Sequence, residues 1–153
     1  MADPTSAAPL VATHTIEFDY RRSVGPVLGA FFEGLQAGKL LGARTKDGRV
    51  LCPPAEYDPD TGAATGERVE VGPAGTVTSF TWVGAPQERH ALQHPFAFAL
   101  IRLDGADTEL LHLVDAGDES AMSTGMRVTP RFRSEPQGGI RDLECFVPGE
   151  ATS

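Results

Sequence analysis

The sequence predicts a mainly β fold, in which one amphipathic helix precedes a small closed or partly closed barrel of five to six strands. Apolar residues follow a helical period over only one early segment. Six short runs rich in β-branched and aromatic residues follow position 67, and clusters of Gly, Pro and Asp separate them. A length of 153 residues is that of one domain with one hydrophobic core.

The first part of the chain is predicted to be a flexible tail over residues 1–14, followed by an extended stretch and the helix over residues 15–41. Ser23 is placed to cap the helix, and Gly38 to end it. One stripe of the helix carries Val24, Val27, Leu28, Phe31, Phe32 and Leu35. The two phenylalanines must be buried, either against the chain's own sheet or against a partner chain.

Residues 42–66 differ in character from the rest. Turn-forming residues dominate, and the only apolar run is Val50-Leu51-Cys52. Pro53 and Pro54 exclude both a helix and an internal strand at that point. Such a segment buries little apolar surface, so we expect either a loop that lies on a partner or a module once held by something else.

Residues 67–148 carry the predicted strands, and residues 149–153 form a second tail. The runs are RVEV, GTVTSFTWV, FAFALIRL, ELLHLV, MRVTPRFR and DLECFV. The tetrapeptide DGAD between the third and fourth runs predicts a tight hairpin.

Charge and cysteine content narrow the function classes. The net charge of −8 disfavours nucleic acids and anionic membranes as partners. No apolar run approaches the roughly 18 residues of a membrane helix, and the first residues do not resemble a signal peptide. Cys52 and Cys145 lie far apart in the sequence, and two free thiols fit a reducing compartment. We therefore expect a cytoplasmic protein.

No pattern of catalytic residues stands out. His90 and His94 have the spacing of metal ligands on one helix face, but the flanking prolines argue for a loop. Ser123-Thr124-Gly125 precedes a strand, unlike the strand-to-helix turn of a nucleophile elbow. We therefore predict no catalytic residues, no metal site and no cofactor bound by the chain alone.

Four segments, in this order, resemble one known family: FFEGLQAGKLLGAR, GRVLCPP, VEVGPAGTVTSFTWV and PFAFALIRLDG. The family is that of the acyl-CoA-associated OB-fold proteins with an N-terminal zinc ribbon, called domain of unknown function 35. The resemblance covers residues 31–148, and it implies that residues 67–148 form an OB-type barrel after a ribbon over residues 42–66.

The ribbon departs from the family pattern. Family members carry a cysteine pair in each of two turns, whereas this chain has RTKDG at 44–48 and YDPD at 57–60. The aspartates there are weak zinc ligands, and Thr45 and Tyr57 are poor replacements for thiolates. The comparison implies a degenerate, metal-free ribbon held by packing around Tyr57 and Leu51, by turn chemistry or by a partner.

The resemblance implies a non-catalytic accessory subunit that binds and stabilises a thiolase-fold acyl-CoA enzyme. That partner would be an aldolase (a lyase) or a thiolase (an acyltransferase) of lipid metabolism, such as steroid side-chain degradation, and the two chains would enclose the CoA thioester together. The residues expected at the partner interface are Phe31, Phe32, Leu35, Cys52, Pro53 and Pro54. Weaker candidates for contacts with CoA phosphates are Arg21, Arg22 and Arg44.

Two other functions stay open. A stand-alone acyl-CoA or lipid carrier would use the barrel as its pocket. A single-stranded nucleic-acid binder would stack bases on aromatic side chains over a basic groove. For the latter, Trp82 is the only tryptophan, and Arg131 and Arg133 are the only compact basic pair on the predicted strands.

Overall fold

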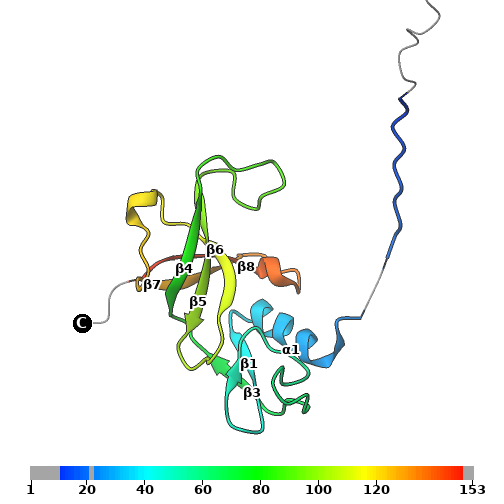
Figure 1. Ribbon diagram of the computed structural model, residues 1–153, viewed down its shortest axis with the longest axis vertical. Helices are drawn as coiled ribbons and strands as arrows, with labels where there is room; N and C mark the ends of the chain where they lie inside the picture. Colours follow the sequence, from blue (N-terminus) through cyan, green and yellow to red (C-terminus); the bar gives the residue numbers. More distant parts are fainter. Residues whose placement is uncertain (1–10, 21–22, 150–153) are drawn as a thin grey trace, which may run out of the picture.

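The computed structural model describes residues 11–20 and 23–149 and contains a small sheet beside a barrel (Figure 1). The helix is α1 (Gly25–Gln36), and the small sheet consists of β1 (Leu40–Arg44), β2 (Val50–Leu51) and β3 (Arg68–Val71). The barrel consists of β4 (Gly75–Val83), β5 (Phe96–Leu103), β6 (Leu110–Val114), β7 (Arg127–Phe132) and β8 (Leu143–Pro148). The 3₁₀ turns are η1 (Glu119–Ala121) and η2 (Ile140–Asp142). No helix in the described ranges is long and apolar enough to cross a membrane.

The barrel closes in the order β4-β5-β6-β8-β7, and β7 pairs back with β4 at Gly75 and Val128. Its strand pairs are antiparallel except for β6 with β8, which run parallel. This is the strand order of an OB-fold. The structure thus confirms the predicted fold class, a mainly β chain with an N-terminal helix and an OB-type barrel.

The interior of the barrel is filled by side chains. Alternate positions of β5 point inward, as the period of two in a strand requires. Residues from all five strands have no exposed surface at all (0 %): Val77, Ile101, Val114, Val128 and Phe146. The barrel is therefore a packed core rather than a ligand cavity, as is usual for small barrels.

The ends of α1 follow from local chemistry. Val24 is the capping residue, one position later than predicted, and the Ser23 hydroxyl accepts the N–H of Gly25 at 3.3 Å. Gly38 ends the helix as predicted, because its φ of +71° reverses the chain and its N–H donates to Leu35 O. The Phe31 and Leu35 side chains lie in the core and Phe32 packs against it, whereas Val24 at the start of the apolar stripe is exposed.

Strand β3 corrects the predicted start of the barrel at residue 67. It pairs antiparallel with β1, from Leu40 opposite Val71 to Ala43 opposite Arg68, and thus belongs to the small sheet. Gly72 has a φ of +75°, a conformation that favours glycine, and the chain turns there before β4 begins. RVEV and GTVTSFTWV have similar strand patterns, so their patterns alone do not reveal that a sheet boundary lies between them.

The tip of the β5–β6 hairpin joins the barrel to the small sheet. Asp107 accepts the N–H of Val50 through Oδ2 at 2.7 Å and donates its own N–H to Val50 O at 2.8 Å. The Thr108 hydroxyl accepts the N–H of Cys52 at 2.7 Å and donates to Cys52 O at 3.0 Å. These two residues, which we call the hairpin latch, supply the hydrogen bonds that β2 would otherwise lack.

Replacing Asp107 with Ala should destabilise the chain by about 1–3 kcal/mol, because it leaves the buried Val50 N–H without an acceptor. Asp107→Asn should retain most of the stability, since its amide oxygen still accepts. Denaturant unfolding of the full chain measures both. Glu109→Gln is the matched control, because its ion pair with Arg102 lies at the surface and contributes little. Equal stabilities of Asp107→Ala and Glu109→Gln would contradict the latch.

Candidate functional site

Two adjoining cavities, of about 470 and 570 Å³, form one open groove on the outside of the barrel. They share Arg133 and Glu144, and both are open to solvent and mainly polar. We call this surface the barrel groove. Its charged lining consists of the arginines Arg89, Arg131, Arg133 and Arg141 and the glutamates Glu88, Glu135 and Glu144.

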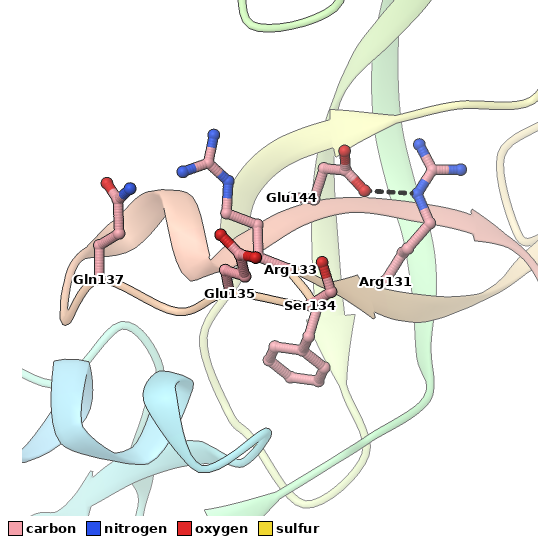
Figure 2. Close-up of a pocket in the computed structure, with 7 residues that line it drawn as sticks. Arg131, Arg133, Ser134, Glu135, Gln137 and Glu144 are labelled. Carbon is pink, nitrogen blue, oxygen red and sulfur yellow. Dashed lines mark hydrogen bonds and ion pairs between the residues drawn. The ribbon is translucent and has the colours of Figure 1, made fainter.

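Arg131 is held in place by two carboxylates. Its Nε lies 2.8 Å from Glu144 Oε2 (Figure 2). Its Nη2 lies 3.1 Å from Asp115 Oδ2. Burial alone would raise the pKa of Asp115, but hydrogen bonds from Arg131 and His94 bring it below its ordinary value. The charge of Arg131 is therefore neutralised within the chain, and this residue anchors the groove.

Arg89, Arg133 and Arg141 differ from Arg131 because none forms an ion pair within the described ranges. All three are exposed and line the larger cavity. Together with Arg131 they place four arginines in the groove against three lining glutamates, so a small excess of positive charge lies here in a chain of net charge −8. Guanidinium groups bind phosphate and carboxylate through paired N–H donors, so the groove is suited to an anion.

The loop that carries Gln137 is fixed by a buried carboxylate. Asp142 accepts the N–H groups of Gln137 at 2.7 Å, Gly138 at 2.7 Å and Gly139 at 3.2 Å. The bond from Gln137 is the largest cause that lowers the pKa of Asp142, so its carboxylate stays charged. The Arg133 N–H donates to the carbonyl oxygen of Asp142 at 2.9 Å, which ties this loop to the end of β7.

His112 forms part of the larger cavity from β6. Its ring meets Phe146 edge to face at 5.8 Å, and its buried Nδ1 has no hydrogen-bond partner in the described structure. Burial lowers the pKa of His112 to about 4. The imidazole is therefore neutral at neutral pH and adds no charge beside the arginines.

The cysteines are chemically unreactive in this fold. Both are free and buried. Burial raises the pKa of Cys52 to about 12 and that of Cys145 to about 11. Each thiol is thus protonated, and a thiolate nucleophile is absent at both positions.

The two histidines considered as metal ligands lie in an irregular loop and have different partners. His94 Nε2 lies 3.1 Å from Asp115 Oδ1, whereas the His90 ring packs edge-on against Phe96 at 5.4 Å. Across residues 11–20 and 23–149, no group of three or more His, Cys, Asp or Glu side chains is placed to hold a metal ion. The exposed arginines of the groove are chemically suited to binding an anion.

The residues predicted at a partner interface are mostly used within the chain. Four of the six are buried in the structure: Phe31, Leu35, Cys52 and Pro54. Phe32 is half-buried against the core, and Pro53 is exposed. The partner interface stays a prediction. Of the six residues, Phe32 and Pro53 keep solvent-accessible surface that a partner could contact.

The arginines predicted to meet CoA phosphates do not line the barrel groove where they are described. Arg44 lies in β1, where it pairs with Glu67 at 3.4 Å and donates to Gly48 O. Arg21 and Arg22 lie outside the described residues.

Sequence reasoning missed the groove as a unit. Arg89, Arg133 and Arg141 come from three separate segments, and only Arg133 drew attention, as part of a basic pair with Arg131. A usable signal is that Arg133 ends one predicted strand and Arg141 immediately precedes the next, within a strongly acidic sequence.

Residues 47–133 match the family described as "ChsH2, C-terminal OB-fold domain". One similar solved structure is the crystal structure of a protein of unknown function from the DUF35 family of Sulfolobus solfataricus. It is 26% identical, covers 70% of this chain and 77% of its own, and has a TM-score of 0.57. The family resemblance inferred from four sequence segments is thereby confirmed.

A second similar structure is a chain of the Ltp2-ChsH2(DUF35) aldolase. It is 23% identical, covers 84% of this chain and 98% of its own, and has a TM-score of 0.61. At this identity the likeness concerns the fold. No curated protein matches the chain.

Replacing His112 with Phe should flatten the pH dependence of stability in acid. As the pH falls from 6.5 towards 4, the unfolded chain protonates this imidazole and the folded chain does not, so stability is lost. The loss attributable to His112 is on the order of 3 kcal/mol. Urea unfolding across this pH range measures it in both proteins. An equal slope in wild type and His112→Phe would contradict the burial argument.

Proposed function

Because this chain belongs to the family defined by the C-terminal OB-fold domain of ChsH2, we propose that it is a non-catalytic accessory subunit of a thiolase-fold acyl-CoA enzyme. The match over residues 47–133 is the observation that carries the proposal. The partner is an aldolase or a thiolase, and an aldolase of steroid side-chain degradation is the first candidate, since a similar fold occurs in the Ltp2-ChsH2(DUF35) aldolase. In this role the protein would work in the cytoplasm, where the partner enzyme acts on CoA thioesters.

The chemistry of the chain supports a role in binding rather than catalysis. Cys52 and Cys145 are held as thiols, and His112 is held neutral in a partly apolar setting. A group that attacks or transfers a proton needs a pKa near the working pH. The reactive side chains of an acyl-CoA enzyme would then come from the partner.

The packed barrel argues against the stand-alone lipid carrier. Such a carrier needs a cavity for the acyl chain, but the interior positions Val77, Ile101 and Val114 are completely buried against one another and their neighbours. The open groove outside the barrel is polar, and its arginines suit phosphates rather than an acyl chain.

The segment before α1 is a suitable contact for a partner subunit. Residues 11–20 extend away from the rest of the chain (Figure 1), and all ten are exposed. Ile16, Phe18 and Tyr20 are 67%, 85% and 79% exposed, and they alternate with Glu17 and Asp19. Large apolar side chains at alternate positions are typical of a strand that covers one face against another protein. We call this segment the N-terminal arm and propose that its apolar side meets the enzyme.

The barrel groove is where the proposed complex would hold the phosphates of CoA. The partner would bind the thioester, while Arg89, Arg133 and Arg141 neutralise the negatively charged end of the cofactor. These exposed arginines surround an open surface, so we expect weak binding by the chain alone.

The chain should co-purify with a thiolase-fold subunit of its own host when the two are co-expressed. Changing Ile16, Phe18 and Tyr20 together to Ser should weaken this complex by roughly tenfold or more, since large apolar anchors dominate interface energies. The matched control changes Glu17 and Asp19 to Ser on the same arm. Loss of complex in the control alone, or co-purification with none of the thiolase-fold subunits, would contradict the proposal.

Single Arg→Ala changes at Arg89, Arg133 and Arg141 should each weaken CoA binding by the complex about tenfold, as expected for the loss of a charge-assisted hydrogen bond. Arg102→Ala is the control, because Arg102 is exposed but pairs with Glu109 away from the groove. Calorimetry measures the affinities. Sub-micromolar binding of a CoA thioester by the isolated chain would instead favour the carrier.

A further inference from the structure

Two turns of the small-sheet region lie where the sequence resemblance implies the metal-binding turns of a zinc ribbon. The first spans residues 45–48, where Thr45 N–H donates to Arg49 O at 2.8 Å and Gly48 N–H to Thr45 O at 3.1 Å. The second spans residues 58–62, where Gly62 N–H donates to Asp58 O at 2.8 Å. Gly48 and Gly62 both have positive φ, so each turn ends in the same left-handed glycine.

The side chains in these turns do not fit a structural zinc ion. Such a site needs four thiolate or imidazole ligands, and the turns offer only hydroxyl and carboxylate groups. These groups are already engaged with one another. The Thr45 hydroxyl bonds to Asp47, and Asp58 accepts the Asp60 N–H at 3.0 Å and the Thr61 hydroxyl at 2.9 Å.

A cation supplied by the chain itself lies between the turns. The guanidinium of Arg49 contacts Asp47 Oδ2 through Nε at 3.0 Å. Its Nη2 contacts Asp58 Oδ1 at 3.0 Å and Asp60 Oδ2 at 2.8 Å. One side chain thus binds a carboxylate of the first turn and two carboxylates of the second.

Asp58 makes this contact structurally necessary. Its side chain is only 3% exposed, whereas those of Asp47 and Asp60 are 56% and 68% exposed. A buried carboxylate needs a counter-ion and hydrogen-bond donors, and Arg49 supplies the charge while Asp60 N–H and Thr61 supply the rest. Exposed ion pairs alone would contribute little.

We infer that Arg49 replaces the structural metal of the ribbon: its guanidinium cross-links the two turns that a zinc ion joins in metal-containing ribbons. The planar, permanently charged group has several N–H donors, and it can bind carboxylates on both turns at once. In the degenerate ribbon, the guanidinium of Arg49 thus supplies the positive charge that a zinc ion supplies in metal-containing ribbons.

Amide hydrogen exchange of the full chain tests this inference. In Arg49→Met, peptides that cover residues 43–51 and 56–65 should exchange roughly tenfold faster or more, because an unpaired buried carboxylate opens both turns. Peptides from β5 and β8 should be unchanged. Arg49→Lys should give an intermediate result, since an ammonium lacks the fork that spans both turns.

Arg102→Met is the matched control for a lost surface ion pair, and it should leave the ribbon peptides unchanged. Should Arg49→Met fail to fold, Asp60→Asn removes one exposed contact of the same guanidinium and should give a smaller acceleration limited to the ribbon.

Wild-type protein provides a test that needs no variant. A zinc chelator should leave exchange in the ribbon unchanged, and metal analysis should find no stoichiometric zinc. One equivalent of zinc, or a ribbon loosened by the chelator, would overturn the inference. So would ribbon exchange in folded Arg49→Met that stays equal to that in Arg102→Met.

Discussion

The hairpin latch holds the small sheet to the barrel, and the arrangement of the other elements depends on it. Strand β2 has only two residues, too few to form a stable sheet edge by itself. Asp107 and Thr108 extend its hydrogen bonding from the barrel side. The apolar core continues across the junction, from Val50 and Val71 in the small sheet to Val77 in the barrel. Helix α1 packs on β1 and contacts η2, so the helix also spans both parts.

The barrel groove combines one ion-paired arginine with three exposed arginines that form no ion pair in the described residues. Several charged side chains whose positions are described pair with a neighbour, as Lys39 does with Glu70 and Arg127 with Asp104. In the groove, Arg131 is paired in this way and the remaining arginines are not. Their exposed positive charge lies above a neutral histidine and beside a loop fixed by Asp142. Exposed guanidinium groups of this kind are suited to an anion such as phosphate.

Much of the fold could be predicted because local patterns and tertiary packing agree. Five barrel strands and α1 have the residue period that their buried faces require, and glycines mark their ends. The assignment of β3 failed because strand pattern does not specify which neighbour a strand pairs with. The groove could not be predicted, since it joins loops that are distant in sequence. The contacts of Arg49 also depend on two turns that only the folded sheet brings together.

The cysteine-free turns of the ribbon affect how the chain depends on the cell. A thiolate site folds only when metal is supplied, and it loses that metal when oxidants attack its sulfur. The turns around Thr45 and Asp58 contain no sulfur, and their cation is synthesised as part of the polypeptide. On the inference that Arg49 replaces the metal, the two turns form without any supply of zinc, and they hold no thiolate ligand for peroxide to oxidise.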